Sequence, residues 1–285
     1  MEGYPAIGAP SMVKLLSPGA EPRTKLRYSV PATYKGTMVS TSTIAMTMSM
    51  AGMEMPPMDL PATTSTADFA VTNVAANGDL SYTMAMGGMT GPPAGGDPTL
   101  AATLQAMDAD IKTLRGTATM SDRGVKRVST FDTSKVTNPQ FKQTLDATRS
   151  LMENLSMPLP EEAVGVGAKW EVRMALSASG LNMFEKLVLE VVSIDGKVVT
   201  IKISGEQTAP AQMMNNPALP PGAEAKVLKA SGVITGTQTL RLDELVCTSV
   251  MNNQLDMDVQ ITMGGQSQTM SMKTTTKSEI APKKS

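Results

Sequence analysis

Methionine is the residue type in this chain that stands out as able to do chemistry, with 25 copies among 285 residues. Six of them lie between residues 43 and 59, in the sequence TIAMTMSMAGMEMPPMD. Thioethers are soft ligands that suit Cu(I), and methionines two or three residues apart can bring their sulfur atoms together. Methionine is also a flexible filler of cores and of adaptable binding surfaces. The sequence therefore leaves open a soft-metal site, the lining of an apolar pocket, or an ordinary core.

Strand alternation accounts for most of these methionines. Residues 34–50 predict one long strand in which apolar and polar side chains alternate, as a half-buried strand requires. Methionines two residues apart on such a strand share one buried face, so no metal is needed to explain them. Two later strands repeat the pattern. We predict that the following residues line an apolar interior and contact its ligand: Met46, Met48, Met50, Met84, Met86, Met270 and Met272.

Three methionines fall outside this alternation. Met53, Met55 and Met58 follow Gly52 in the segment GMEMPPMDLP. Prolines cannot sustain a strand ladder, so the segment is predicted to be an apolar, proline-stiffened hairpin tip. In order of preference, the three methionines form the rim of the pocket, a docking surface for a partner, or a soft-metal site.

The composition does not support catalytic chemistry. The chain has no histidine, which removes the usual general base and the commonest metal ligand. Cys247 is the one cysteine, and its apolar surroundings DELVCTSV favour a small buried apolar residue. The carboxylate pairs 108/110 and 161/162 are interpreted as solvated faces. We therefore predict no catalytic residue, no metal site, no cofactor and no enzymatic activity.

Charge and hydropathy exclude two kinds of interaction. The chain has 25 basic and 26 acidic residues, whereas a nucleic-acid partner requires a basic face. No apolar window of about 18 residues is present, so no transmembrane segment is predicted. Residues 1–23 lack a basic start followed by an apolar run and are predicted to be a flexible leader, rich in proline and glycine.

Strand signals dominate the rest of the chain. Asn77-Gly78 and Asp195-Gly196 are expected to be tight hairpin turns. Two amphipathic helices are predicted in the first half, near residues 98–115 and 138–155, each beginning at a capped proline. Gly116 is expected to end the first helix. Residues 24–280 are predicted to form a single β-rich domain, followed by a tail over residues 281–285.

The predicted fold class is mainly β (α+β). Long strands with one apolar face must curl or pack to hide that face. We therefore expect a curved antiparallel sheet, barrel or half-barrel of about ten to twelve strands, with the two helices inserted in its first half.

This order of elements resembles a family of uncharacterised bacterial envelope proteins, many of them similar to lipoproteins. The resemblance covers about residues 24–280 and rests on LRYSV, on MSMAGMEM and on LPEEAVGVGAKWEV, which contains Pro160, Val164, Val166, Gly167 and Trp170. More loosely, the expected fold is similar to half-barrel lipoprotein and lipid carriers. The resemblance implies a periplasmic, envelope or secreted location, with no export signal in this chain. One departure is that no cysteine near the N-terminus could carry a lipid anchor.

These observations favour a non-enzymatic envelope protein that shelters a lipid, an acyl chain or another hydrophobic small molecule in a Met-, Leu- and Val-lined interior. The first alternative is a structural or interaction module with a filled core, which contacts another envelope protein. The second alternative is a Cu(I)-binding protein rich in methionine.

Overall fold

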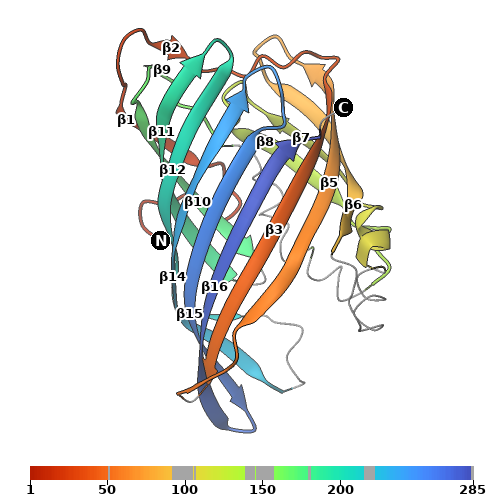
Figure 1. Ribbon diagram of the computed structural model, residues 1–285, viewed down its shortest axis with the longest axis vertical. Coiled ribbons are helices and arrows are strands. Elements are labelled where there is room, and N and C mark those ends of the chain that lie inside the picture. The colour runs from red at the N-terminus through yellow and green to blue at the C-terminus, as the bar shows by residue number, and fades with distance from the viewer. Residues whose placement is uncertain are drawn as a thin grey trace.

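The computed structural model describes residues 1–50, 52–91, 105, 107–138, 145, 157–178, 181–214 and 222–283. Most of them belong to long antiparallel strands that run side by side in one curved sheet (Figure 1). The strands are β1 (Met12–Ser17), β2 (Thr24–Lys25), β3 (Lys35–Met50), β4 (Met53–Glu54), β5 (Met58–Val74), β6 (Leu80–Thr90), β7 (Arg115–Met120), β8 (Lys126–Asp132), β9 (Ala163–Val164), β10 (Lys169–Ala178), β11 (Leu181–Asp195), β12 (Val198–Ala209), β13 (Gln212–Met214), β14 (Glu224–Arg241), β15 (Thr248–Met263) and β16 (Gln266–Pro282).

Two meanders make up the large sheet. One runs from β3 to β8 and the other from β10 to β16, and the pairing of β16 with β3 joins them. In the described residues, β1 and β8 end the strand order and do not pair with each other, so the sheet is not closed. The predicted curved antiparallel sheet is confirmed, and the closed-barrel alternative is wrong. The sheet has 14 strands, more than expected, because short strands such as β1, β4 and β13 carry little periodicity.

The concave face of the sheet can be followed along every long strand. Met38 on β3 and Ile280 on β16 line a pocket together with Gln238 on β14 and Tyr82 on β6. Side chains from such distant strands meet only on the inside of the curve. Successive side chains of a strand point to opposite faces. The concave face of β3 therefore also carries Met46, Met48 and Met50, which are half-buried, whereas residues 43, 45 and 47 are exposed.

The hairpin turns confirm two sequence predictions and correct a third. Gly78 and Gly196 have positive φ angles of 84° and 55° in the predicted tight turns. The whole segment GMEMPPMDLP is predicted to be a hairpin tip, but β5 already starts at Met58 within it. Pro61 lies where the β3–β5 register shifts between Ser42 and Ile44. Because a bulge leaves a residue unpaired, it tolerates a proline inside a strand.

The two predicted helices are not seen at their predicted lengths. Among the described residues, helix is seen in one short run at 105 and 107–111 and at the single residue Leu145, and residues 98–104 lie outside the described part. Gly116 does not end this helix but lies inside β7. The physical reason is that Leu114 is 1% exposed and its carbonyl accepts the Met86 N–H at 3.2 Å, which docks the chain onto β6. The predicted helix at 138–155 lies almost wholly outside the described residues.

The largest core cluster packs one end of the concave face. Trp170 on β10 is fully buried, and its Nε1 donates a hydrogen bond to the Pro158 carbonyl at 3.1 Å. Around it lie apolar residues of β10, β11, β12 and β14 and of the loops at 26 and 159. A second cluster covers β5 and β6 through Phe69, Met84 and Phe131. Residues 12–17, within the predicted leader, form the edge strand β1 against β10.

Candidate functional site

A set of methionines meets on the concave face of β15, β16 and β3. They lie toward the β15–β16 turn, which we call the lower end of the sheet (Figure 1). The register pairs Met272 with both Met257 and Met48, which places three thioether side chains in one row. In the adjacent row, Met270 pairs with Met50. Directly opposed residues of antiparallel strands have Cβ atoms about 5 Å apart. We define the methionine face as Met46, Met48, Met50, Met257, Met270 and Met272.

The methionine face is apolar but only partly covered. All six residues are half-buried, and Met257 packs against the cluster around Val259. Among the described residues, the other five belong to none of the core clusters. An uncovered apolar patch on a protein surface is typical of a binding site.

The three methionines of the hairpin tip extend this face, which corrects the expectation that alternation leaves them unexplained. Met53 pairs with Met50, and Met58 pairs with Met46. The Met55 N–H donates to the Met48 carbonyl at 2.8 Å. The ladder thus continues through β4, interrupted by two prolines, and the side chains of Met53, Met55 and Met58 are 73%, 43% and 45% exposed. That they form the rim of a binding site stays a prediction.

Met84 and Met86 do not join the methionine face. They lie on β6, where Met86 pairs with Ala67, and Ala67 in turn pairs with Met38 at the other end of β3. Met38 and Met46 are eight residues apart, roughly 26 Å along a strand. Met84 is buried in the cluster around Phe69. The seven predicted ligand-binding residues therefore divide into five that share one face and two that lie in the core.

A polar band crosses the concave face next to the methionines. Gln207 on β12 is 1% exposed, and its Nε2 donates to Oδ1 of Asn253 on β15. To reach it, the Gln207 side chain lies over Gly232 on β14, where an added Cβ would come within 2.7 Å of Gln207 Nε2. Thr274 and Thr276 continue the band on β16, since they pair with residues 255 and 253.

Glu185 on β11 adds a carboxylate to this band. It pairs with Met174 on one side and with Gln207 on the other, so it shares their concave face. Burial raises its pKa from 4.5 to about 7, because desolvation penalises the charged form. The sequence analysis missed Glu185, although its signal was readable: one acidic residue interrupts the apolar alternation of residues 181, 183, 187 and 189.

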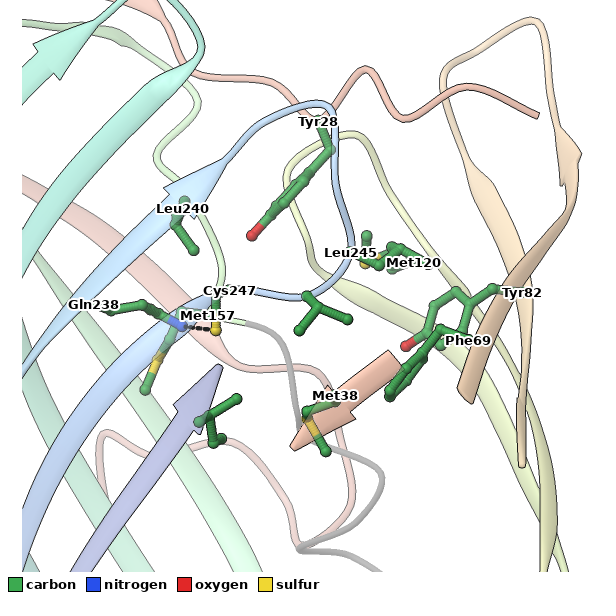
Figure 2. A pocket seen from close by; sticks show the side chains of 12 residues that line it. Tyr28, Met38, Phe69, Tyr82, Met120, Met157, Gln238, Leu240, Leu245 and Cys247 are labelled. Carbon is green, nitrogen blue, oxygen red and sulfur yellow. Dashed lines mark hydrogen bonds between the residues drawn. The ribbon is translucent and has the colours of Figure 1, made fainter. Parts of the chain in front are cut away.

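A small pocket lies at the packed end of the concave face, beneath the loop that carries Cys247 (Figure 2). Its volume is about 60 Å³. Gln238 Nε2 donates to the Cys247 sulfur at 3.0 Å, and Gln238 Oε1 is buried without a partner. Burial raises the pKa of the Cys247 thiol. Tyr28 and Tyr82 also have pKa values raised by burial.

The candidate carboxylate pairs have structural roles. Asp110 is 4% exposed rather than solvated, and accepts hydrogen bonds from the backbone N–H groups of Thr137 and Asn138. These bonds lower its pKa. Asp108 accepts the Met89 N–H at 2.7 Å and bonds Lys112 at 2.6 Å. The carboxylate of Glu161 lies 3.4 Å from Arg123, while Glu162 is exposed.

Within the described residues, no three His, Cys, Asp or Glu side chains are grouped so that they could hold a metal ion. In the same part of the chain, no helix has the length and apolar character needed to span a membrane.

A larger depression of about 410 Å³ lies where Met48, Met257 and Met272 meet polar residues such as Asp258 and Lys273. Asp258 and Lys273 belong to the convex face by alternation, so this depression extends beyond the methionine face.

Comparison with known proteins adds little. No protein-family model and no curated protein matches the chain. A mutant of the Rh. blastica porin is similar at 6% identity, over 86% of this chain and 100% of that chain, with a TM-score of 0.25. Pseudomonas aeruginosa OpdQ is similar at 7% identity, over 87% of this chain and 98% of that chain, with a TM-score of 0.21. At these scores neither likeness supports a conclusion, and the resemblance to envelope lipoproteins stays a prediction.

Proposed function

We propose that this protein is a non-enzymatic binding protein that holds the apolar part of a lipid or acyl chain against the methionine face. The main observation in support is that the register of β15, β16 and β3 brings six half-buried methionines together on a concave surface. The proposed envelope location follows from the family resemblance alone.

The character of the surface supports a flexible apolar ligand. Methionine side chains are unbranched and polarizable, so they adapt to a chain without a fixed shape. Aromatic residues make up 3% of the sequence, which disfavours sites that recognise sugars or bases by stacking. Sites for small molecules commonly have volumes of about 300–1,000 Å³, so the 60 Å³ pocket near Cys247 is too small for an acyl chain.

The test is displacement of an environment-sensitive fluorescent lipid probe from the purified protein. Met48→Glu places a charge in the central row of the methionine face and should weaken probe binding at least about tenfold, since a charge in an apolar site is strongly unfavourable. The matched control is Thr47→Glu, which places the same charge on the exposed convex face of the same strand and should leave binding unchanged.

Two outcomes would count against the proposal. A wild-type protein that binds no lipid probe, and carries no extractable lipid when purified from its source, would remove its basis. Equal losses for Met48→Glu and Thr47→Glu would place the ligand elsewhere. The first outcome would favour a structural or interaction module whose exposed Met53 contacts another protein.

Soft-metal binding is a second candidate, because the row Met257–Met272–Met48 brings three thioethers together. Thioether sulfur is a favourable ligand for Cu(I). Titration of Cu(I) against a competing chelator should show binding that Met272→Leu abolishes, since leucine keeps the apolar volume and removes the sulfur. A protein that does not compete with the chelator would exclude this function.

A further inference from the structure

Among the described positions of the concave face on β10 to β16, β3 and β5, one residue is charged. Alternation assigns 181, 183, 185, 187, 189 and 191 of β11 to this face, together with the residues that pair with them on β10 and β12. When the register is followed across β14, β15, β16, β3 and β5, the described concave positions carry apolar residues, glycine, proline, serine, threonine, asparagine or glutamine. Glu185 is the one acidic or basic side chain among them.

Neutral groups flank Glu185 on both sides. Met174 lies beside it on β10 and Gln207 on β12. The charged residues of these strands, including Arg173 and Glu206, belong to the convex face by alternation, and Glu206 pairs there with Lys186 at 3.4 Å. In the described part of the chain, the Glu185 carboxylate makes no ion pair. A carboxylate removed from water without a counter-ion is unfavourable, and a bound cation relieves that cost.

The polar band beside Glu185 consists of neutral groups that bond to one another. The Gln207 side chain extends from β12 toward β15, where its Nε2 donates a hydrogen bond to Oδ1 of Asn253. Because Gly232 has no side chain, the Gln207 side chain can cross β14 and reach Asn253 on β15. A protonated amine has three donors and no acceptor, so it complements a carboxylate that makes no ion pair within the described residues.

We propose that Glu185 binds the protonated amine of a cationic amphiphile whose apolar chain lies on the methionine face. This inference rests on the proposed function and specifies its ligand class. Cross-strand pairing places Glu185, Gln207, Gly232 and Leu255 in one row. Met257 is two residues after Leu255 on the same face of β15. Three strand spacings separate β11 from β15, about 14 Å, which an alkyl chain extending from the amine can span.

The experiment compares three ligands with the same alkyl chain: dodecylamine, dodecanol and dodecanoate. Each displaces the fluorescent lipid probe from the intact protein at pH 8. We expect the amine to displace the probe at a concentration at least about tenfold below that of the alcohol, and the carboxylate to be the weakest. Glu185→Gln keeps the shape of the side chain and should abolish the preference for the amine while dodecanol binding is retained.

The matched control is Glu190→Gln, on the convex face of the same strand, where the carboxylate lies 3.4 Å from Lys169. This variant should keep the preference for the amine. If amine and alcohol bind equally to the wild type, or if Glu185→Gln keeps the preference, the inference is wrong although the proposed function stands. If none of the three ligands displaces the probe, the proposed function and this inference both fail.

Discussion

The two ends of the concave face belong to one sheet but lie on different strands and are covered differently. At the upper end, Trp170, Leu189 and Ile201 are completely buried under loops that return across the sheet. At the lower end, Met48, Met50 and Met272 stay half-buried, and the hairpin tip at residues 53–58 is exposed. The same alternation therefore produces a core where a second layer covers the strands and a surface where the described residues do not cover them.

The two ends therefore differ in how tightly their side chains are packed. Rigid Trp, Leu, Ile and Val side chains occupy the upper end, where close packing specifies one arrangement. Flexible methionines occupy the lower end, where the contacts of an adaptable surface can change. Between the two ends lies the polar band with Gln207 and Asn253.

The largest expected effect is at the upper end. Trp170→Ala removes a fully buried ring and the hydrogen bond to Pro158, and should lower the free energy of unfolding by about 3–5 kcal/mol. Met48→Ala, at a half-buried position, should cost less than about 2 kcal/mol. Urea denaturation of both variants measures the contrast. Equal losses would mean that the lower end is packed as tightly as the upper end.

An effect of intermediate size is expected from Glu185, which lies in the polar band between the two ends. Its titration should make the free energy of unfolding depend on pH. Because its pKa is raised from 4.5 to about 7, the folded state holds this proton between those pH values more often than the unfolded state does. The free energy of unfolding should therefore fall as the pH rises from 4.5 to 7 and level off above 7. In Glu185→Gln this contribution is absent, so the free energy of unfolding of the variant should exceed that of the wild type by about 3 kcal/mol at pH 8.

Thermal unfolding between pH 4 and 8 measures this dependence, with Glu190→Gln as the control. The wild type and Glu185→Gln should have similar stability near pH 4 and diverge as the pH rises. Parallel pH profiles would show that Glu185 is solvated, and would weaken the case for a cation beside it.

Much of the sheet could be predicted because its long strands have a strict period. The run 34–50 matches β3 to within one residue, and the expected alternation of Met46, Met48 and Met50 is seen. The glycine turns at 78 and 196 occur where their dipeptides place them. These features depend on residues close in sequence, so local patterns were sufficient.

The features that were missed depend on pairing between distant segments. Nothing near residue 270 shows that β16 joins β3, so the sequence could not bring Met272 next to Met48 or separate Met84 from both. The end of the helix before Leu114 is set by docking onto β6, which competes with the periodic pattern of residues 100–114. Two-residue strands such as β4 have no period to detect.

The smallest expected effect on stability distinguishes the two interpretations of the lower end. Met48→Leu and Met272→Leu conserve apolar volume, so each should change the free energy of unfolding by less than about 1 kcal/mol. If the methionine face holds an acyl chain, lipid-probe affinity should change by less than about threefold, because the surface remains apolar. If it holds Cu(I), the double variant should lose metal binding, because the register places these two sulfurs in one row. Lipid displacement and Cu(I) competition on the same two variants therefore separate a hydrocarbon surface from a thioether site, while both variants stay folded.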